Sequence, residues 1–190
     1  LSALEWYTSG DISAFEGCFD GKGYTVYGLY GNADEQDEYA ALIPVLGTES
    51  QLKGVRIDNS YFEGVSGAYL GGLAGVLEDN SAVATNINAC VIGNNVAFYG
   101  EANVGGIIAE IGFARANVEN CVFKGAINTS GVSYGICGNV IGKIQINECI
   151  SLNVTPIASS DKTVVKNIYT NVQTIGEGII VLEYEKMVGI

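Results

Sequence analysis

The sequence predicts an all-β protein, a right-handed parallel β-helix (β-solenoid) with coils of about 30 residues, from three observations. Short runs of β-branched and aromatic residues are separated by Gly, Asn, Asp and Ser, and a helical period is almost absent. A glycine-rich segment recurs along the chain, and a second apolar pattern follows each copy at a constant phase. The right hand is expected because parallel crossovers are almost always right-handed.

The glycine-rich segment is clearest at residues 68–75, which read Ala-Tyr-Leu-Gly-Gly-Leu-Ala-Gly. Residues 39–44, 104–109 and 134–138 repeat its order of small residues, apolar residues and a turn former. Equivalent positions in the four copies are 31, 34 and 29 residues apart, at Ala41, Gly72, Gly106 and Gly135. Such variation is typical of loops of different length between repeated coils. The glycine pairs are expected to form corners where a Cβ would clash.

The second pattern consists of an apolar residue, two further residues and another apolar or small residue. Its first position is Leu52, Ile87, Val118 or Ile146, and its second position is Val55, Cys90, Cys121 or Cys149. Fainter versions lie at residues 26–29 and 165–168. If each repeat is one coil, each set stacks as an inward ladder, and every coil buries its apolar face only against its neighbours. A β-sandwich would not need this constant phase. Each coil has room for three strands of about five residues.

One β-solenoid domain is expected over residues 1–190, since domains commonly contain about 100 to 200 residues. Residues 1–14 form a poorly patterned leading segment, residues 15–150 the repeats, and residues 151–190 a degenerate last coil with C-terminal strands. In the first repeat, residues 20–23 are a turn, residues 24–29 alternate as a strand, and residues 31–39 are an acidic loop.

The segment at residues 71–75, followed by the apolar pattern, resembles the GLUG-motif repeat, and residues 15–29 resemble the lead-in that often precedes such repeats. The resemblance covers residues 15–150, with Ala109 and Tyr134 standing where the motif has glycine. It implies a fragment of a large bacterial cell-surface or secreted protein, in which such repeats are structural or adhesive modules. No catalytic residue is inherited from this family.

The net charge of −12 argues against two classes of partner. Residues 1–95 contain 13 acidic and 3 basic residues, so nucleic acid and anionic membrane surfaces would be repelled. No apolar run approaches the ~18 residues that span a bilayer, so no membrane insertion within this chain is expected. Acidity also keeps an apolar, glycine-rich chain soluble.

The cysteines are interpreted as core residues. The chain has five, at positions 18, 90, 121, 137 and 149, with no Cys-x-x-Cys pair and no histidine, which excludes the usual zinc and haem sites. Cys90, Cys121 and Cys149 are predicted to be small buried fillers. A disulfide between successive rungs is the alternative, because stacked Cα atoms would lie ~4.8 Å apart.

No catalytic, cofactor-binding or metal-ligating residue is predicted. Without histidine, Ser-His-Asp and Cys-His machinery is excluded. The dense carboxylate group Asp34, Glu35, Asp37 and Glu38 lacks the spacing of a dedicated calcium loop and is interpreted as solvated. If the chain is instead an enzyme on polysaccharides, these carboxylates are its best candidates.

The predicted function is that of a non-catalytic structural or adhesive module. Its expected partners are host or microbial glycans or surface proteins, and the sequence does not indicate an oligomeric state. The alternative is a carbohydrate-binding or polysaccharide-active β-helix. Tyrosines beside Asn and Asp could form a sugar-binding face, or serve as ordinary strand residues, at positions Tyr24, Tyr27, Tyr30, Tyr61, Tyr69 and Tyr99.

Overall fold

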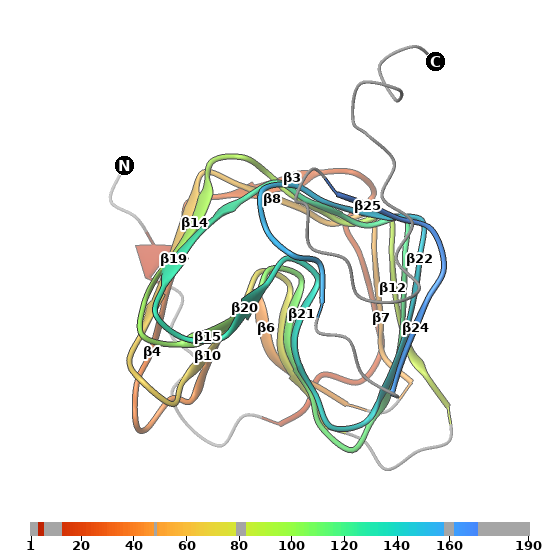
Figure 1. Cartoon of the computed structure of the whole chain (residues 1–190), viewed down its shortest axis with the longest axis horizontal. Coiled ribbons are helices and arrows are strands. Elements are labelled where there is room, and N and C mark those ends of the chain that lie inside the picture. The colour runs from red at the N-terminus through yellow and green to blue at the C-terminus, as the bar shows by residue number, and fades with distance from the viewer. Residues whose placement is uncertain (1–3, 6–12, 48, 79–82, 158–161, 171–190) are drawn as a thin grey trace.

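The chain is a parallel β-solenoid in a computed structural model that describes residues 4–5, 13–47, 49–78, 83–157 and 162–170. The described residues form strands and turns and contain no helix. All the pairings between the strands are parallel, and neighbours in each sheet come from successive coils (Figure 1). The predicted fold class is therefore confirmed.

Five sheets run along the solenoid, and we number them in the order in which a coil passes through them. Sheet 1 contains β2 (Cys18–Asp20), β7 (Gln51–Lys53), β12 (Thr85–Asn88), β17 (Arg115–Glu119), β22 (Lys143–Asn147) and β24 (Thr163–Val165). Sheet 2 contains β3 (Thr25–Tyr27), β8 (Arg56–Asp58), β13 (Val91–Ile92), β18 (Val122–Phe123), β23 (Cys149–Ser151) and β25 (Ile168–Thr170).

The remaining three sheets are shorter along the solenoid axis. Sheet 3 contains β1 (Leu4–Glu5), β4 (Leu29–Ala33), β9 (Ser60–Gly64), β14 (Val96–Gly100) and β19 (Ala126–Thr129). Sheet 4 contains β5 (Tyr39–Ala40), β10 (Tyr69–Gly71), β15 (Asn103–Gly105) and β20 (Ser133–Tyr134). Sheet 5 contains β6 (Ile43–Leu46), β11 (Ala74–Leu77), β16 (Ile108–Ile111) and β21 (Cys137–Val140).

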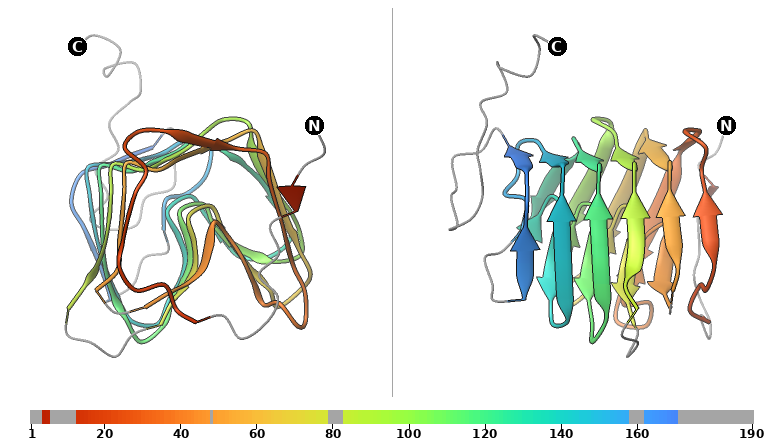
Figure 2. Two further views of the ribbon diagram at one scale, coloured as in Figure 1. Left: turned by 180° about the vertical axis from the view of Figure 1, so that it is seen from behind. Right: turned by 90° about the vertical axis from the view of Figure 1, so that its right-hand side faces the viewer.

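Four coils pass through all five sheets, over residues 18–46, 51–77, 85–111 and 115–140, and we call them coils 1 to 4. In Figure 1 each coil leads from sheet 1 on the right, over the top, to sheet 3 on the left. The later coils lie nearer to the viewer, as the side view in Figure 2 also shows, so the solenoid is right-handed. After coil 4 the chain adds further strands to sheets 1 and 2, and Ile157 forms a bridge to Cys137.

Each coil has five short strands where the sequence predicted three longer ones. The difference lies in the glycine-rich segment, which folds sheets 4 and 5 into a ridge that points into the solenoid (Figure 2, left). A Cβ added at Gly71 would lie 1.8 Å from the carbonyl oxygen of Ala74, and one at Gly105 would lie 1.7 Å from that of Ile108. Only glycine allows the two backbones to approach this closely.

The tip of the ridge meets the inner face of sheet 2. A Cβ at Gly72 would lie 2.5 Å from the side chain of Ile92, and one at Gly106 would lie 2.2 Å from the ring of Phe123. The interior is therefore packed in two halves on either side of the ridge. In the half beside sheet 3, the rings of Phe62 and Phe98 stack with centroids 5.2 Å apart.

The other half contains the predicted inward ladders. Strand register pairs Leu52 with Ile87, Ile87 with Val118, and Val118 with Ile146, and none of these side chains is more than 1% exposed. The stacking order proposed from the sequence is confirmed, because the constant phase reflects inward positions on adjacent rungs.

The turn from sheet 1 to sheet 2 recurs along the solenoid with one shared feature. The residue just before the second position of the apolar pattern has a left-handed backbone conformation. The residues are Gly54, Ala89, Asn120, Glu148 and Asn167, with φ of 59°, 54°, 53°, 52° and 35°. A single left-handed residue turns the strand sharply and points the next side chain inward. The corner accepts Ala and Glu as well as Gly and Asn, so the sequence carries no uniform signal for it.

Candidate functional site

The acidic loop at residues 34–38 joins β4 to β5 and is closed by its own backbone. The Asp34 carboxylate accepts hydrogen bonds from the amides of Asp37 and Gln36, both at 2.8 Å. These two donors hold the pKa of Asp34 below its ordinary value, because they favour the charged form. In the part of the chain that the structure describes, no group of three or more His, Cys, Asp or Glu side chains is arranged to hold a metal ion.

An open depression of about 430 Å³ lies beside this loop. Its lining comes from coils 1, 2 and 3 and consists of Asp34, Glu35, Gln36, Val65, Ser66 and Glu101. Asp34 and Glu101 are 67 residues apart in the sequence, yet the solenoid places them two coils apart on the same corner. Three carboxylates therefore share one surface hollow.

Three tyrosines form a row on the outer face of sheet 3, next to the depression. The ring centroids of Tyr30 and Tyr61 are 5.8 Å apart, and those of Tyr61 and Tyr99 are 5.1 Å apart, with interplanar angles of 18° and 22°. Tyr30 and Tyr61 are register partners, whereas Tyr99 is the partner of Glu63, so the row runs diagonally across the coils. Tyr61 and Tyr99 are 37% and 39% exposed.

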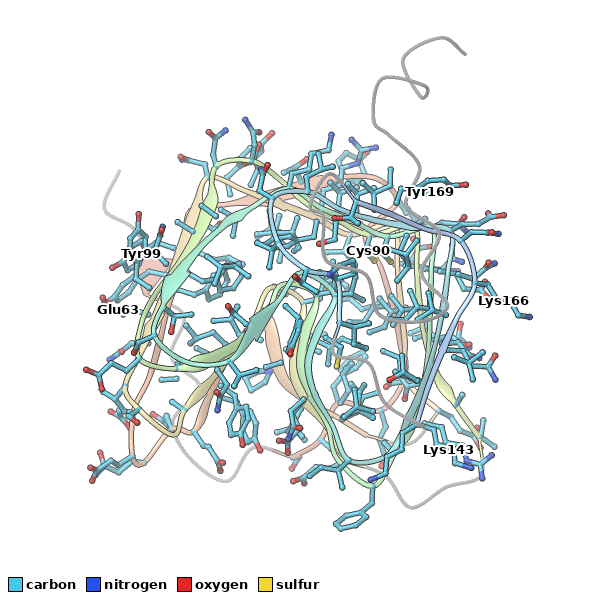
Figure 3. The ribbon with its side chains drawn as sticks, viewed as in Figure 1. Glu63, Cys90, Tyr99, Lys143, Lys166 and Tyr169 are labelled. Atoms are coloured by element: carbon cyan, nitrogen blue, oxygen red, sulfur yellow. The ribbon has the colours of Figure 1, made fainter. Side chains whose placement is uncertain are left out.

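Glu63 lies within this row and joins two of its members. Its carboxylate accepts a hydrogen bond from the Tyr30 hydroxyl and a second, of 3.0 Å, from the Tyr61 hydroxyl. The bond to Glu63 raises the pKa of Tyr61, because a phenolate there would face a carboxylate. Figure 3 shows Glu63 and Tyr99 pointing outward from the same side of the solenoid. We call Tyr30, Tyr61, Glu63 and Tyr99 the tyrosine face.

A second aromatic group lies between sheets 4 and 5. The rings of Tyr39 and Tyr69 stack at 5.4 Å, and Glu110 of sheet 5, only 8% exposed, accepts a hydrogen bond of 2.7 Å from the Asn139 side chain. Burial, followed by the charge of Glu110, raises the pKa of both tyrosines. Their rings and the carboxylate pack the outer side of the ridge, so Tyr69 is a structural residue.

The structure therefore separates the six tyrosines singled out in the sequence. Tyr30, Tyr61 and Tyr99 gather in one row, whereas Tyr24 and Tyr27 belong to coil 1 at sheet 2, where they are 78% and 66% exposed. Only the first group forms an extended surface with a carboxylate at its centre.

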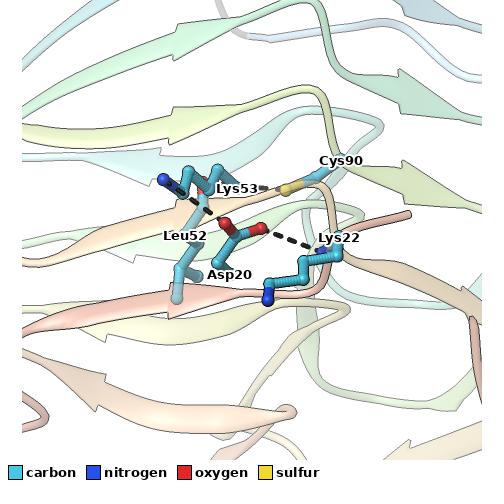
Figure 4. A network of polar contacts seen from close by, with 5 residues as sticks. All are labelled: Asp20, Lys22, Leu52, Lys53 and Cys90. Carbon is cyan, nitrogen blue, oxygen red and sulfur yellow. Dashed lines mark hydrogen bonds and ion pairs between the residues drawn. The ribbon is translucent and has the colours of Figure 1, made fainter. Parts of the chain in front are cut away.

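Cys90, Cys121 and Cys149 are buried and stack on successive coils, as predicted, and we call them the thiol ladder. Each thiol donates to a carbonyl of the preceding coil; the Cys90 thiol does so to Leu52, 3.8 Å away (Figure 4). Contact with the neighbouring thiols, together with burial, raises the pKa of Cys121 well above its ordinary value. All five cysteines are free thiols, with Cys18 exposed.

Sequence reasoning missed Glu63 and Glu101. Glu63 lies two residues after Tyr61 on β9, and Glu101 lies two residues after Tyr99, just beyond the end of β14. A search for carboxylates at the phase of these tyrosines would have found both, whereas a search for dense acidic runs found only the loop at residues 34–38.

The described residues include no helix long and apolar enough to cross a membrane. The family resemblance of the glycine-rich segment remains a prediction. Comparison of the chain with protein-family models, with curated protein sequences and with solved structures finds no match in any of the three.

Proposed function

We propose that this chain is a non-catalytic adhesive module of a bacterial cell-surface or secreted protein, and that it contacts its partner through the tyrosine face. The observation that carries the proposal is the row of three stacked tyrosines around Glu63 on an outward sheet. Partly exposed tyrosines provide large contact areas at low cost in conformational entropy, which is why they are enriched at binding surfaces.

The solenoid supports this use because it holds the face rigidly. Each residue of the tyrosine face lies on a strand that pairs on both sides with neighbouring strands of sheet 3, as β9 pairs with β4 and β14. Sites built on strands keep their geometry better than sites on loops. The likeness of residues 71–75 to the GLUG motif supports a surface or secreted location.

A carbohydrate-binding or polysaccharide-active β-helix is the second candidate, favoured by the carboxylates in the depression beside the row. Two features weigh against it. Both faces of Tyr61 are covered by its neighbours in the row, so this ring offers a sugar its edge and not its face. Asp34 holds loop amides, and its lowered pKa makes it a poor proton donor at neutral pH.

The test compares two double variants on a glycan array and on immobilised surface proteins. Tyr61→Ser/Tyr99→Ser removes the exposed part of the tyrosine face, and Tyr24→Ser/Tyr27→Ser removes two more exposed tyrosines elsewhere. We expect the first variant to lose the binding of the wild-type chain and the second to keep it. Equal binding by both variants would refute the proposal. Polysaccharide cleavage that Asp34→Asn/Asp37→Asn abolishes would support the enzymatic alternative.

A further inference from the structure

The basic residues are segregated around the circumference of the solenoid, whereas acidic residues lie on both sides of it. Every lysine and arginine among the described residues lies on sheets 1 and 2 or in a turn flanking them, at Lys22, Lys53, Arg56, Arg115, Lys124, Lys143, Lys162 and Lys166. Sheet 3 and the turns that follow it carry Asp34, Glu35, Asp37, Glu38, Glu63 and Glu101, without a base among their described residues. Figure 3 shows Glu63 on the side opposite Lys143 and Lys166.

Because every described base lies on sheets 1 and 2 or in a turn flanking them, sheet 3 has no positive charge of its own among its described residues. On sheet 1 the charges are partly paired within the chain: the Lys53 ammonium lies 3.4 Å from the Asp20 carboxylate (Figure 4). No described cation lies within ion-pair distance of Glu35, Glu63 or Glu101. Sheet 3 therefore presents an uncompensated negative potential that attracts cations.

We propose that the tyrosine face and the adjoining depression bind a basic segment of a partner protein, one that carries lysine or arginine at alternate positions. The inference deepens the proposed function, on which it rests, by naming the chemistry of the partner. Charge complementarity selects a cationic occupant and disfavours acidic polysaccharides. The tyrosines favour lysine and arginine over a bare metal ion, because the apolar stems of these side chains can pack along the exposed edges of the rings.

The spacing of the coils fits a short extended peptide that runs along the solenoid axis. Rungs of a parallel sheet are ~4.8 Å apart, so coils 1 and 3 are separated by about 10 Å. Alternate residues of an extended peptide are ~6.6 Å apart, and the long stems of lysine and arginine can diverge to span the difference. Side chains at alternate positions of such a peptide point to the same side. One basic head can then reach Glu35 on coil 1 and the next Glu101 on coil 3, with Val65 and Ser66 of coil 2 between them.

The test measures fluorescence anisotropy of a labelled decapeptide with alternating lysine or arginine and serine, at low salt. The face variant is Glu35→Gln/Glu63→Gln/Glu101→Gln, which leaves Asp34 in its loop. The matched control, Glu49→Gln/Glu119→Gln/Glu148→Gln, removes the same charge from exposed positions in turns or on sheet 1. We expect the wild-type chain to bind the peptide, the face variant to bind about tenfold more weakly and the control to stay within about twofold, as three exposed ion pairs predict.

Two further measurements are needed. One distinguishes binding at the tyrosine face from attraction by the overall charge, and the other distinguishes failure of this proposal from failure of the proposed function. Tyr99→Ser leaves the charge unchanged and is expected to weaken binding of the peptide. Absence of peptide binding, or equal weakening in the face variant and its control, would overturn the basic partner. The peptide test could fail in this way while the glycan or surface-protein binding of the wild-type chain still required Tyr61 and Tyr99. The proposed function would then stand with a different partner.

Discussion

Replacement of Gly105 by alanine tests whether the glycine-rich repeat exists to build the ridge. The new Cβ would lie 1.7 Å from the carbonyl oxygen of Ile108 and 2.5 Å from the amide nitrogen of Gly138, whereas ordinary contacts begin at 3.4 Å. Both neighbours are backbone atoms, so no side-chain rotation can relieve the clash, and the strands of sheets 4 and 5 must separate.

The cost follows from two contributions. Inserting a methyl group into a packed region costs about 1–3 kcal/mol even when side chains can adjust. The separation also strains the hydrogen bonds from Gly106 N to Tyr134 O (2.9 Å) and from Ile108 N to Ile136 O (3.0 Å), each with a net value of about 1 kcal/mol. We therefore expect Gly105→Ala to lower the free energy of unfolding by about 3–5 kcal/mol, a large part of the ~5–15 kcal/mol of a typical domain.

Urea denaturation followed by far-UV circular dichroism measures this loss, provided that the m-value is unchanged. Gly67→Ala is the control, because φ at Gly67 is +90° but no atom lies within 4 Å of its added Cβ, so only the backbone cost of about 1–2 kcal/mol applies. If both substitutions cost the same, close approach of the two sheets is not the reason for the glycine, and our account of the ridge is wrong.

The remaining predictions concern thiols, tyrosines and the left-handed corner. The thiol ladder is expected to react slowly with a thiol reagent in the native chain and rapidly in denaturant; fast native labelling would contradict its burial. Burial and Glu110 raise the pKa of Tyr39 and Tyr69 in the folded chain above the ordinary tyrosine value of about 10. The stability that these protonated hydroxyls contribute is therefore complete below about pH 10 and is lost as the pH rises above it. Tyr69→Phe should therefore flatten the alkaline fall in stability, and an unchanged pH profile would exclude this linkage. Ala89→Asn should raise stability by about 0.5 kcal/mol, since Asn tolerates a φ of 54° better than Ala; a loss would show that Ala89 has another role.

The coil period and the inward ladders could be predicted because each depends on side chains that repeat at one phase. Leu52 and Ile87 have to face the same interior on successive rungs, and an apolar side chain at a fixed interval records that requirement. The ridge could not be predicted in detail, because glycine indicates a close approach without identifying the approaching atoms. For Gly105 the approaching atom is the oxygen of Ile108, three residues later in the same coil.

The candidate site was predicted less well than the fold. The sequence emphasised the dense carboxylates at residues 34–38, where Asp34 proves to be bound to its own loop. Glu101 shares a depression with Asp34 and Glu35 only because coils stack. Its spacing after Tyr99 indicates an outward position but does not identify these two neighbours. Tyr99 stacks on Tyr61 although the two are not register partners. A prediction that groups residues at equivalent positions of successive coils would therefore not include Tyr99.

The parallel hydrogen bonds between coils also determine how the chain would respond to tension. These bonds run along the solenoid axis, so a pull on the two ends of the chain peels one strand at a time from its neighbour instead of shearing whole sheets. A released coil of ~30 residues extends to about 100 Å at ~3.3 Å per residue. Because each coil contacts only its neighbours, release can proceed coil by coil while the rest stays folded. A module of this kind would lengthen in steps under load. Release from the C-terminal side would reach the tyrosine face only after coil 4, whereas release from the N-terminal side would remove Tyr30 with coil 1.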